Sequence, residues 1–188
     1  MPVAGRRGVA RATLTPVLIV RRIRPDEGTR LRHVRLAALN DSPSAFASTY
    51  AVEATLPAAH WSQRAADTAS GDDSAIFLAL VDEEVVGVVG TFRTALDSAV
   101  VRLGAMWAAP ARRGVGVGRR LVAAVLDWAS ESGAAEVELW VTAGNVSAQA
   151  LYESTGFTST SERQPLPSDP TLTVLRMTRL PVRMPHPA

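Results

Sequence analysis

Three glycines alternate with other residues between two pairs of arginines in the stretch "RRGVGVGRRL", residues 112–121. Gly114, Gly116 and Gly118 leave the main chain bare and free to take dihedral angles that other residues avoid. An apolar-periodic segment follows directly, which predicts a turn between a strand and a helix. The free amides and the positive dipole end of a helix N-terminus bind anions. These residues therefore predict a phosphate site that suits a pyrophosphate.

The spacing of the glycines separates the phosphate-binding motifs that could account for them. A dinucleotide-binding turn needs G-x-G-x-x-G, but Arg119 stands where its third glycine would be. A P-loop needs a lysine, and the chain has none. The alternative without a ligand is a flexible glycine-rich turn. The flanking arginines favour an anion over that alternative, and they are Arg112, Arg113, Arg119 and Arg120.

The composition is that of an ordinary globular protein, and it limits the possible chemistry. The chain has 188 residues, 47% of them hydrophobic, and can bury a full core. It has no cysteine and three scattered histidines, which excludes disulfides and thiolate catalysis and makes a metal site unexpected. The net charge of +2 is small and the one dense cluster of basic residues is local, so we expect no nucleic-acid partner. No apolar run approaches the ~18 residues of a membrane span or makes a secretory signal, so we expect a cytoplasmic protein without a membrane partner.

Apolar periodicity predicts the strands and helices that position the glycine turn. The segment after the turn places Leu121, Val122, Val125 and Ala129 on one helical face, and Gly133 is placed to end that helix. Strands are predicted at 17–24, 74–81, 84–94, 100–109, 136–141, 157–161 and 173–180, and helices near 25–38, in two short pieces of 44–69 broken at Pro57, at 119–133 and at 145–156.

One domain is predicted over residues 17–180. Residues 1–16 lack apolar periodicity and are expected to be a disordered arm, and residues 181–188 are expected to be a short tail.

Two motifs in this order resemble the GCN5-related N-acetyltransferases, or GNAT family. The family's R/Q-x-x-G-x-G/A turn is matched by residues 113–118, and "NVSAQALYESTGF", residues 145–157, is similar to its following helix. The matching positions in that helix are Asn145, Ala148, Leu151, Tyr152, Gly156 and Phe157. The resemblance implies an α/β fold with a mixed, mostly antiparallel sheet of six to seven strands, flanked by about four helices and splayed between strands 4 and 5.

The same resemblance implies acetyl-coenzyme A as cofactor. The amides of residues 115–119 would hold its pyrophosphate, with charge from Arg113 and Arg119, and Asn145 would bond its pantetheine arm. A bulge in the fourth strand would expose main chain at 106–108 to that arm and to the thioester carbonyl. The implied cofactor-binding residues are Met106, Trp107, Ala108, Arg113, Gly114, Val115, Gly116, Val117, Gly118, Arg119, Asn145, Ala148 and Tyr152.

The implied activity is transfer of an acetyl group to a primary amine by direct attack. Tyr152, an O–H donor with an ordinary pKa of ~10, resembles the family's general acid; the alternative is an aromatic at the edge of the core. Some members carry a glutamate base on the fourth strand, but "VVRLGAMW" has no carboxylate. The base stays open between Glu138, Glu53, His60 and ordered water.

Phe46, Tyr50 and Trp140 are the candidates for the wall of the acceptor pocket, although aromatic residues are more often core. The acceptor stays open between an antibiotic, a polyamine, an amino acid and a protein N-terminus, that is, a small-molecule or peptide amine. Alternatives are a non-catalytic acyl-coenzyme A binding or sensing module and a transferase of longer acyl groups. A homodimer is possible for this family.

Overall fold

The structure is a computed structural model that describes residues 17–180. The predicted arm, residues 1–16, and the predicted tail, residues 181–188, lie outside the described residues. Seven strands form one sheet, and five α-helices and two short 3₁₀ helices connect them. The strands are β1 (Leu18–Arg22), β2 (Ser74–Val81), β3 (Glu84–Arg93), β4 (Val100–Ala108), β5 (Glu136–Thr142), β6 (Thr158–Leu166) and β7 (Asp169–Arg179). The helices are α1 (Gly28–Asp41), η1 (Pro43–Ala45), α2 (Tyr50–Ala54), α3 (Ala58–Thr68), η2 (Pro110–Arg112), α4 (Val117–Glu131) and α5 (Val146–Ser154).

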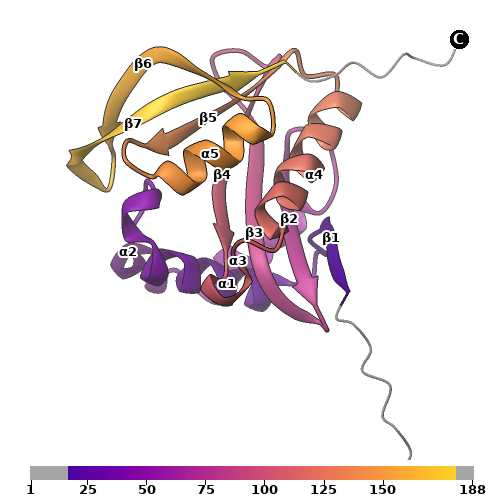
Figure 1. The fold of residues 1–188 in the computed structure, drawn as a ribbon. Coiled ribbons are helices and arrows are strands. Elements are labelled where there is room, and N and C mark those ends of the chain that lie inside the picture. The colour runs from indigo at the N-terminus through magenta and orange to yellow at the C-terminus, as the bar shows by residue number, and fades with distance from the viewer. Residues whose placement is uncertain (1–16, 181–188) are drawn as a thin grey trace, which may run out of the picture.

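The sheet has the strand order β1-β2-β3-β4-β5-β7-β6. Only β4 and β5 pair in parallel, and every other neighbouring pair is antiparallel. Helices α4 and α5 cover one face, and α1 to α3 lie at the other (Figure 1). The expected fold class is confirmed for residues 17–180, with seven strands and with five α-helices where the resemblance implied about four.

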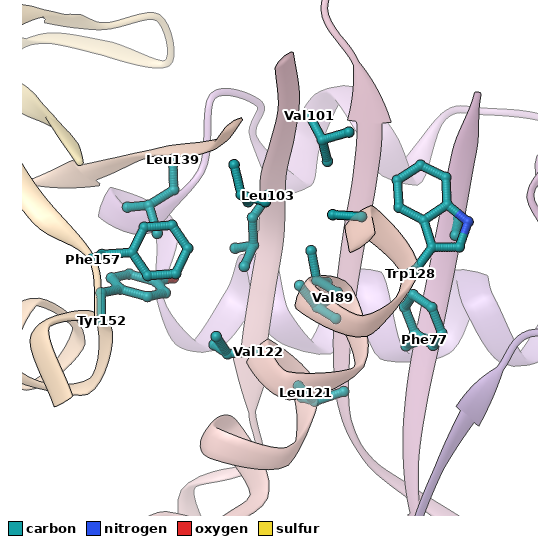
Figure 2. Packing of buried hydrophobic residues seen from close by; sticks show 14 of the residues in the cluster. Phe77, Val89, Val101, Leu103, Leu121, Val122, Trp128, Leu139, Tyr152 and Phe157 are labelled. Atoms are coloured by element: carbon teal, nitrogen blue, oxygen red, sulfur yellow. The ribbon is translucent and has the colours of Figure 1, made fainter. Parts of the chain in front are cut away.

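Two apolar cores lie on the two faces of the sheet. The core under α4 contains the predicted helical face, and Leu121, Val122, Val125 and Ala129 are all fully buried (Figure 2). Burying a side chain of this size contributes about 1.5–3 kcal/mol, so this face fixes α4 on the sheet. The other core lies under α1 and α3, around Trp61 and Leu39.

Strand β4 contains a bulge at Ala105, whose φ is +52°. In the register with β3, Gly104 pairs with Gly90 and Trp107 pairs with Val88, so β4 has one extra residue between these pairs. Pairing of β4 with β5 ends at Leu103. The main chain of β4 beyond the bulge therefore has no β5 neighbour, which is the expected splay between strands 4 and 5.

The bulge also reverses which side chains of β4 face which core. Leu103 packs in the core under α4, and strict alternation would place Trp107 there as well. The extra residue instead turns Trp107 into the core under α1, while Met106 and Ala108 pack on the α4 side.

Helix α5 has capping interactions at both ends that follow from its sequence. The Asn145 side chain accepts a hydrogen bond of 3.2 Å from the Ala148 amide at the N-terminus. At the C-terminus Gly156 has φ +89°, and the Phe157 amide donates to the Tyr152 carbonyl at 3.0 Å. This is the Schellman motif, in which an apolar contact accompanies the hydrogen bonds. Here that contact is the edge-to-face packing of Tyr152 on Phe157, with ring centroids 5.9 Å apart.

The last two strands are longer than the sequence patterns predict, at 158–166 and 169–179 instead of 157–161 and 173–180. β6 is mostly exposed and polar and contains Pro165, features that suggest a loop in a sequence. An edge strand tolerates both features, because one side of its main chain has no partner to lose.

Candidate active site

The glycine-rich turn links the splayed end of β4 to α4. Gly114 and Gly116 have φ values of +78° and +92°, a region that residues with a Cβ enter only with strain. A Cβ at either position would meet nothing within 4 Å, so the backbone conformation and not space requires glycine here.

The turn presents a run of amides without partners. Gly116 caps α4 without a side-chain hydrogen bond, and the first amide of the helix that finds a carbonyl is Arg120, which donates to Gly116 at 3.1 Å. Within residues 17–180 the six amides of 114–119 donate to no acceptor. Unpaired amides at a helix N-terminus form an anion site, and these lie where the sequence predicted a pyrophosphate.

Gly118 has a different role from the other two glycines. It lies in the first turn of α4, and a Cβ there would lie 2.9 Å from a methyl carbon of Leu151. The absence of a side chain lets α5 approach the start of α4, which brings Tyr152 beside the turn.

A cavity of about 650 Å³ lies along the splay, between the turn, β4, β5 and α5. Its volume is within the range of small-molecule and cofactor sites. The predicted site residues that line it are Met106, Trp107, Ala108, Arg113, Gly114, Gly116, Gly118, Arg119, Trp140, Asn145, Ala148 and Tyr152.

Two predicted cofactor residues do not line the cavity with their side chains. The side chain of Val115 is 67% exposed at the tip of the turn, and Val117 is buried in the core under α4. Both were predicted to act through their amides, and those amides belong to the unpaired run.

Arg113 is held by neighbours within the protein. Its Nε donates to the Ala108 carbonyl at 3.1 Å, and its Nη2 donates to the Asp41 carboxylate, which is also an ion pair. Asp41 ends α1 and also accepts hydrogen bonds from Ser42 and from the indole nitrogen of Trp107. The Ser42 hydroxyl and these two further donors hold the pKa of Asp41 below its ordinary value. Arg119 donates to Ser154 at the end of α5, at 3.2–3.3 Å.

Tyr152 has a buried ring and a hydroxyl that is free to donate. The residue is only 6% exposed, and its ring lies in the core beside Phe157 and Leu139 (Figure 2). Within residues 17–180 the hydroxyl makes no hydrogen bond. Burial raises the pKa of Tyr152 above its ordinary value of 10, so the group stays protonated at neutral pH. Because Tyr152 also lines the cavity, its O–H can serve as a proton donor there.

The predicted acceptor residues do not come together. Trp140 lines the cavity, whereas Phe46 is 4% exposed and lies in the core under α1, with the Arg35 guanidinium 4.7 Å above its ring. Tyr50 is half exposed at the start of α2 and lies outside the lining. The cavity instead includes Ser42 and Ala45 beside η1, which no motif singled out.

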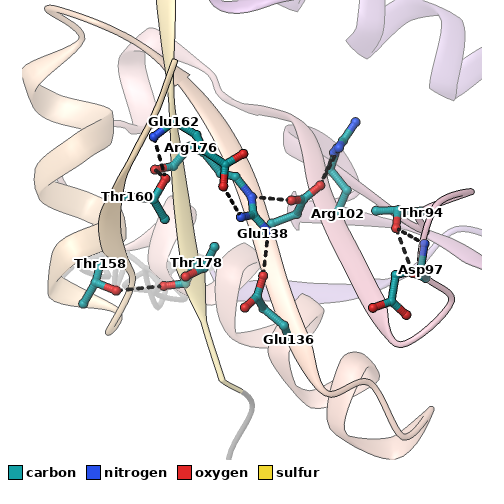
Figure 3. Close-up of polar contacts among 10 residues, drawn as sticks. All are labelled: Thr94, Asp97, Arg102, Glu136, Glu138, Thr158, Thr160, Glu162, Arg176 and Thr178. Atoms are coloured by element: carbon teal, nitrogen blue, oxygen red, sulfur yellow. Dashed lines mark hydrogen bonds and ion pairs between the residues drawn. The ribbon is translucent and has the colours of Figure 1, made fainter. Parts of the chain in front are cut away.

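The candidate bases lie outside the cavity lining. Glu138 is paired with Arg102 and Arg176 on the face opposite α4 (Figure 3). Glu53 is paired with Arg35, and His60 is exposed on α3 with its ring against Trp61. Among residues 17–180 no cluster of His, Asp and Glu could hold a metal ion.

Comparison with known proteins identifies the family and the fold. The family model of the GNAT acetyltransferases matches residues 36–157, and this chain belongs to that family. No curated protein sequence matches the chain.

Solved structures show the same fold at low sequence identity. An acetyltransferase of the GNAT family from Streptococcus pneumoniae is 19% identical, covers 87% of this chain and 99% of its own, and has a TM-score of 0.72. The ribosomal-protein-alanine N-acetyltransferase of Brucella melitensis is also 19% identical, with 86% and 99% coverage and a TM-score of 0.67. The yncA protein of Salmonella typhimurium, solved with its cofactor acetyl-CoA, is 16% identical, with 92% and 98% coverage and a TM-score of 0.70.

No helix within residues 17–180 is long and apolar enough to cross a membrane.

Proposed function

We propose that this protein is an N-acetyltransferase that moves the acetyl group of acetyl-coenzyme A to a primary amine of a small molecule or peptide. The observation that carries the proposal is the run of unpaired amides at 114–119, which opens into the cavity along the splay between β4 and β5. A diphosphate and an extended thioester arm together match these two features in charge and shape.

Different residues of the cavity bind different parts of the cofactor. The amides of 114–119, a run that begins one residue earlier than the resemblance implied, hold the pyrophosphate, and Arg119 at the same helix end adds positive charge. The main chain of 106–108, which has lost its β5 neighbour, pairs with the pantetheine arm as an additional strand would. The side-chain oxygen of Asn145 already accepts the capping hydrogen bond of α5. Its side-chain nitrogen is therefore the group that donates a hydrogen bond to the pantetheine arm.

Acetyl-coenzyme A supplies an activated acetyl group as a thioester. The main-chain amides of 106–108 stabilise the negative charge that develops on the carbonyl oxygen during attack. The amine nitrogen forms a C–N bond as the C–S bond breaks, and the Tyr152 hydroxyl donates its proton to the leaving thiolate. The nitrogen releases its surplus proton to water, and Tyr152 recovers a proton from water.

Calorimetry with acetyl-coenzyme A tests the binding half of this proposal. We expect saturable binding with a Kd in the micromolar range. Thiol release with a library of amines then tests the catalytic half, since a sensing module binds the cofactor without acceptor-dependent release. Absence of binding removes the basis of the proposal.

We further propose a cytoplasmic enzyme, which fractionation of cells tests. A homodimer stays a prediction, and light scattering of the purified protein tests it.

A further inference from the structure

The polar lining of the cavity consists of cations and neutral groups. Three arginines, Arg112, Arg113 and Arg119, line it near the turn. Near the contact between β5 and η1, the side chains that line the cavity are neutral. They are those of Ser42, Ala45, Trp140 and Thr142. Of the described residues that line the cavity, none is Asp, Glu or His. Tyr152 is the remaining group that titrates, and burial keeps it a neutral donor.

Two carboxylates adjoin lining residues along the chain: Glu153, which is exposed on α5 and is not part of the lining, and Asp41, which is already occupied. Asp41 precedes the lining residue Ser42, but it accepts hydrogen bonds from Ser42, Trp107 and Arg113. These donors lower its pKa, which makes it a weaker base than an ordinary aspartate.

The carboxylate on β5 is occupied in the same way. Glu138 lies on β5 two residues before the lining residue Trp140, but its side chain is only 6% exposed and each of its oxygens accepts a hydrogen bond from an arginine. Arg102 donates to one oxygen at 2.7 Å, and Arg176 donates to the other at 2.6 Å (Figure 3). Removing a proton from an ammonium group would require this carboxylate to leave two arginines.

A cavity without a free base favours amines of low basicity, because they are already neutral in solution. At pH 7.5 only about one lysine-type amine in a thousand is neutral, with a pKa of ~10.4, whereas about a third of α-amino groups are, with a pKa of ~7.7–8.0. The described lining also offers no carboxylate that could pair with an acceptor carrying several positive charges.

Building on the proposed function, we infer that the acceptor is an α-amino group, that of a peptide N-terminus or an amino-acid derivative, which enters the cavity as the neutral amine. No side chain among residues 17–180 removes the proton before attack. The acceptor's own basicity therefore sets how the rate depends on pH, and polyamines and lysine side chains are poor acceptors at neutral pH.

The test uses the intact protein and three acceptors. One is a lysine-free tripeptide amide with a free N-terminus, the second is the same length with a blocked N-terminus and one lysine, and the third is spermidine. Thiol release gives kcat/KM from pH 4.5 to 10, corrected for hydrolysis without enzyme. We expect an inflection near 8 for the first peptide and near 10 for the second. The first should be preferred about 100-fold or more at pH 7.5, and the preference should narrow as the pH rises.

Glu138→Gln provides a second measurement, because Glu138 is more deeply buried than Asp41 and the glutamine keeps a hydrogen-bond acceptor. We expect the pH inflections of this variant to match the pKa of each acceptor, as in the native protein. If the variant does not fold, the pH profiles of the native protein decide alone. A shared inflection between pH 5 and 7 for both peptides, or a preference for spermidine, would overturn the inference and leave the transferase proposal standing. Binding of acetyl-coenzyme A without thiol release with any amine would overturn both.

Discussion

The indole nitrogen of Trp107 donates a hydrogen bond of 2.9 Å to the Asp41 carboxylate. This contact joins the last residue of α1 to β4 just beyond its bulge, and the same carboxylate holds Arg113 of the cofactor turn. One acidic side chain therefore connects the helical layer around the acceptor end to the strand and the turn that would hold the cofactor.

Asp41→Ala should destabilise the protein by about 1–3 kcal/mol, because the buried Trp107 nitrogen loses its acceptor. Asp41→Asn, which keeps an acceptor oxygen, should lose less stability than Asp41→Ala. Because the folded pKa of Asp41 lies below its ordinary value, the stability from this contact is present above pH 4 and is lost as the pH falls through the folded pKa. Urea unfolding at pH 7 and pH 3 measures both effects. Equal stability of the two variants at pH 7 would contradict this role.

Gly116→Ala should weaken binding of acetyl-coenzyme A by at least about tenfold, because a Cβ disfavours the φ of +92° that turns the amides outward. The same strain should cost about 1–2 kcal/mol of stability. Gly71→Ala is the matched control, with φ +79° and equally open space but a position outside the cavity. It should show a similar loss of stability with unchanged affinity by calorimetry. Equal affinity in the two variants would show that the conformation at Gly116 does not hold the cofactor.

Tyr152→Phe should keep its affinity for acetyl-coenzyme A and lose about 10²-fold or more in kcat. The ring keeps its packing on Phe157, and the hydroxyl has no partner among residues 17–180 to lose, so stability should change little. Tyr50→Phe changes the other tyrosine of the chain, which is exposed and outside the cavity, and should leave kcat unchanged. An unchanged kcat in Tyr152→Phe would assign the proton donor elsewhere.

Ala105→Gly should retain activity and gain about 1 kcal/mol in stability, because glycine takes the positive φ of the bulge without strain. Ala105→Val should lose stability and cofactor affinity, since a β-branched residue resists this conformation. Thermal unfolding and calorimetry measure the pair. Unchanged behaviour of the valine variant would mean that the bulge is not needed to expose the main chain of 106–108.

The parts of the site that local sequence signals encode were predictable. Asn145 and Gly156 cap the ends of α5, and the spacing of Tyr152 and Phe157 around that C-cap follows from one helix turn. Gly114 and Gly116 likewise predict the turn, because few other residues adopt the positive φ angles that it requires.

The parts that depend on distant contacts were not predictable. The family resemblance implied a bulge in the fourth strand, but alanine is not a local signal for one, so the sequence did not place it at Ala105 or indicate that Trp107 would turn away from the face of Leu103. Phe46 is buried because it packs into the core under α1, and Asp41 gains its role only when α1 meets β4.

The central claim is that the amides of 114–119 hold the diphosphate of acetyl-coenzyme A. Titration of ¹⁵N-labelled protein with the cofactor, followed by amide chemical shifts, tests it at each residue. The account predicts that the largest shifts fall on Gly114 to Arg119 and move downfield as these amides gain acceptors, with smaller shifts at 106–108. Saturable binding that leaves the shifts of 114–119 unchanged would contradict it.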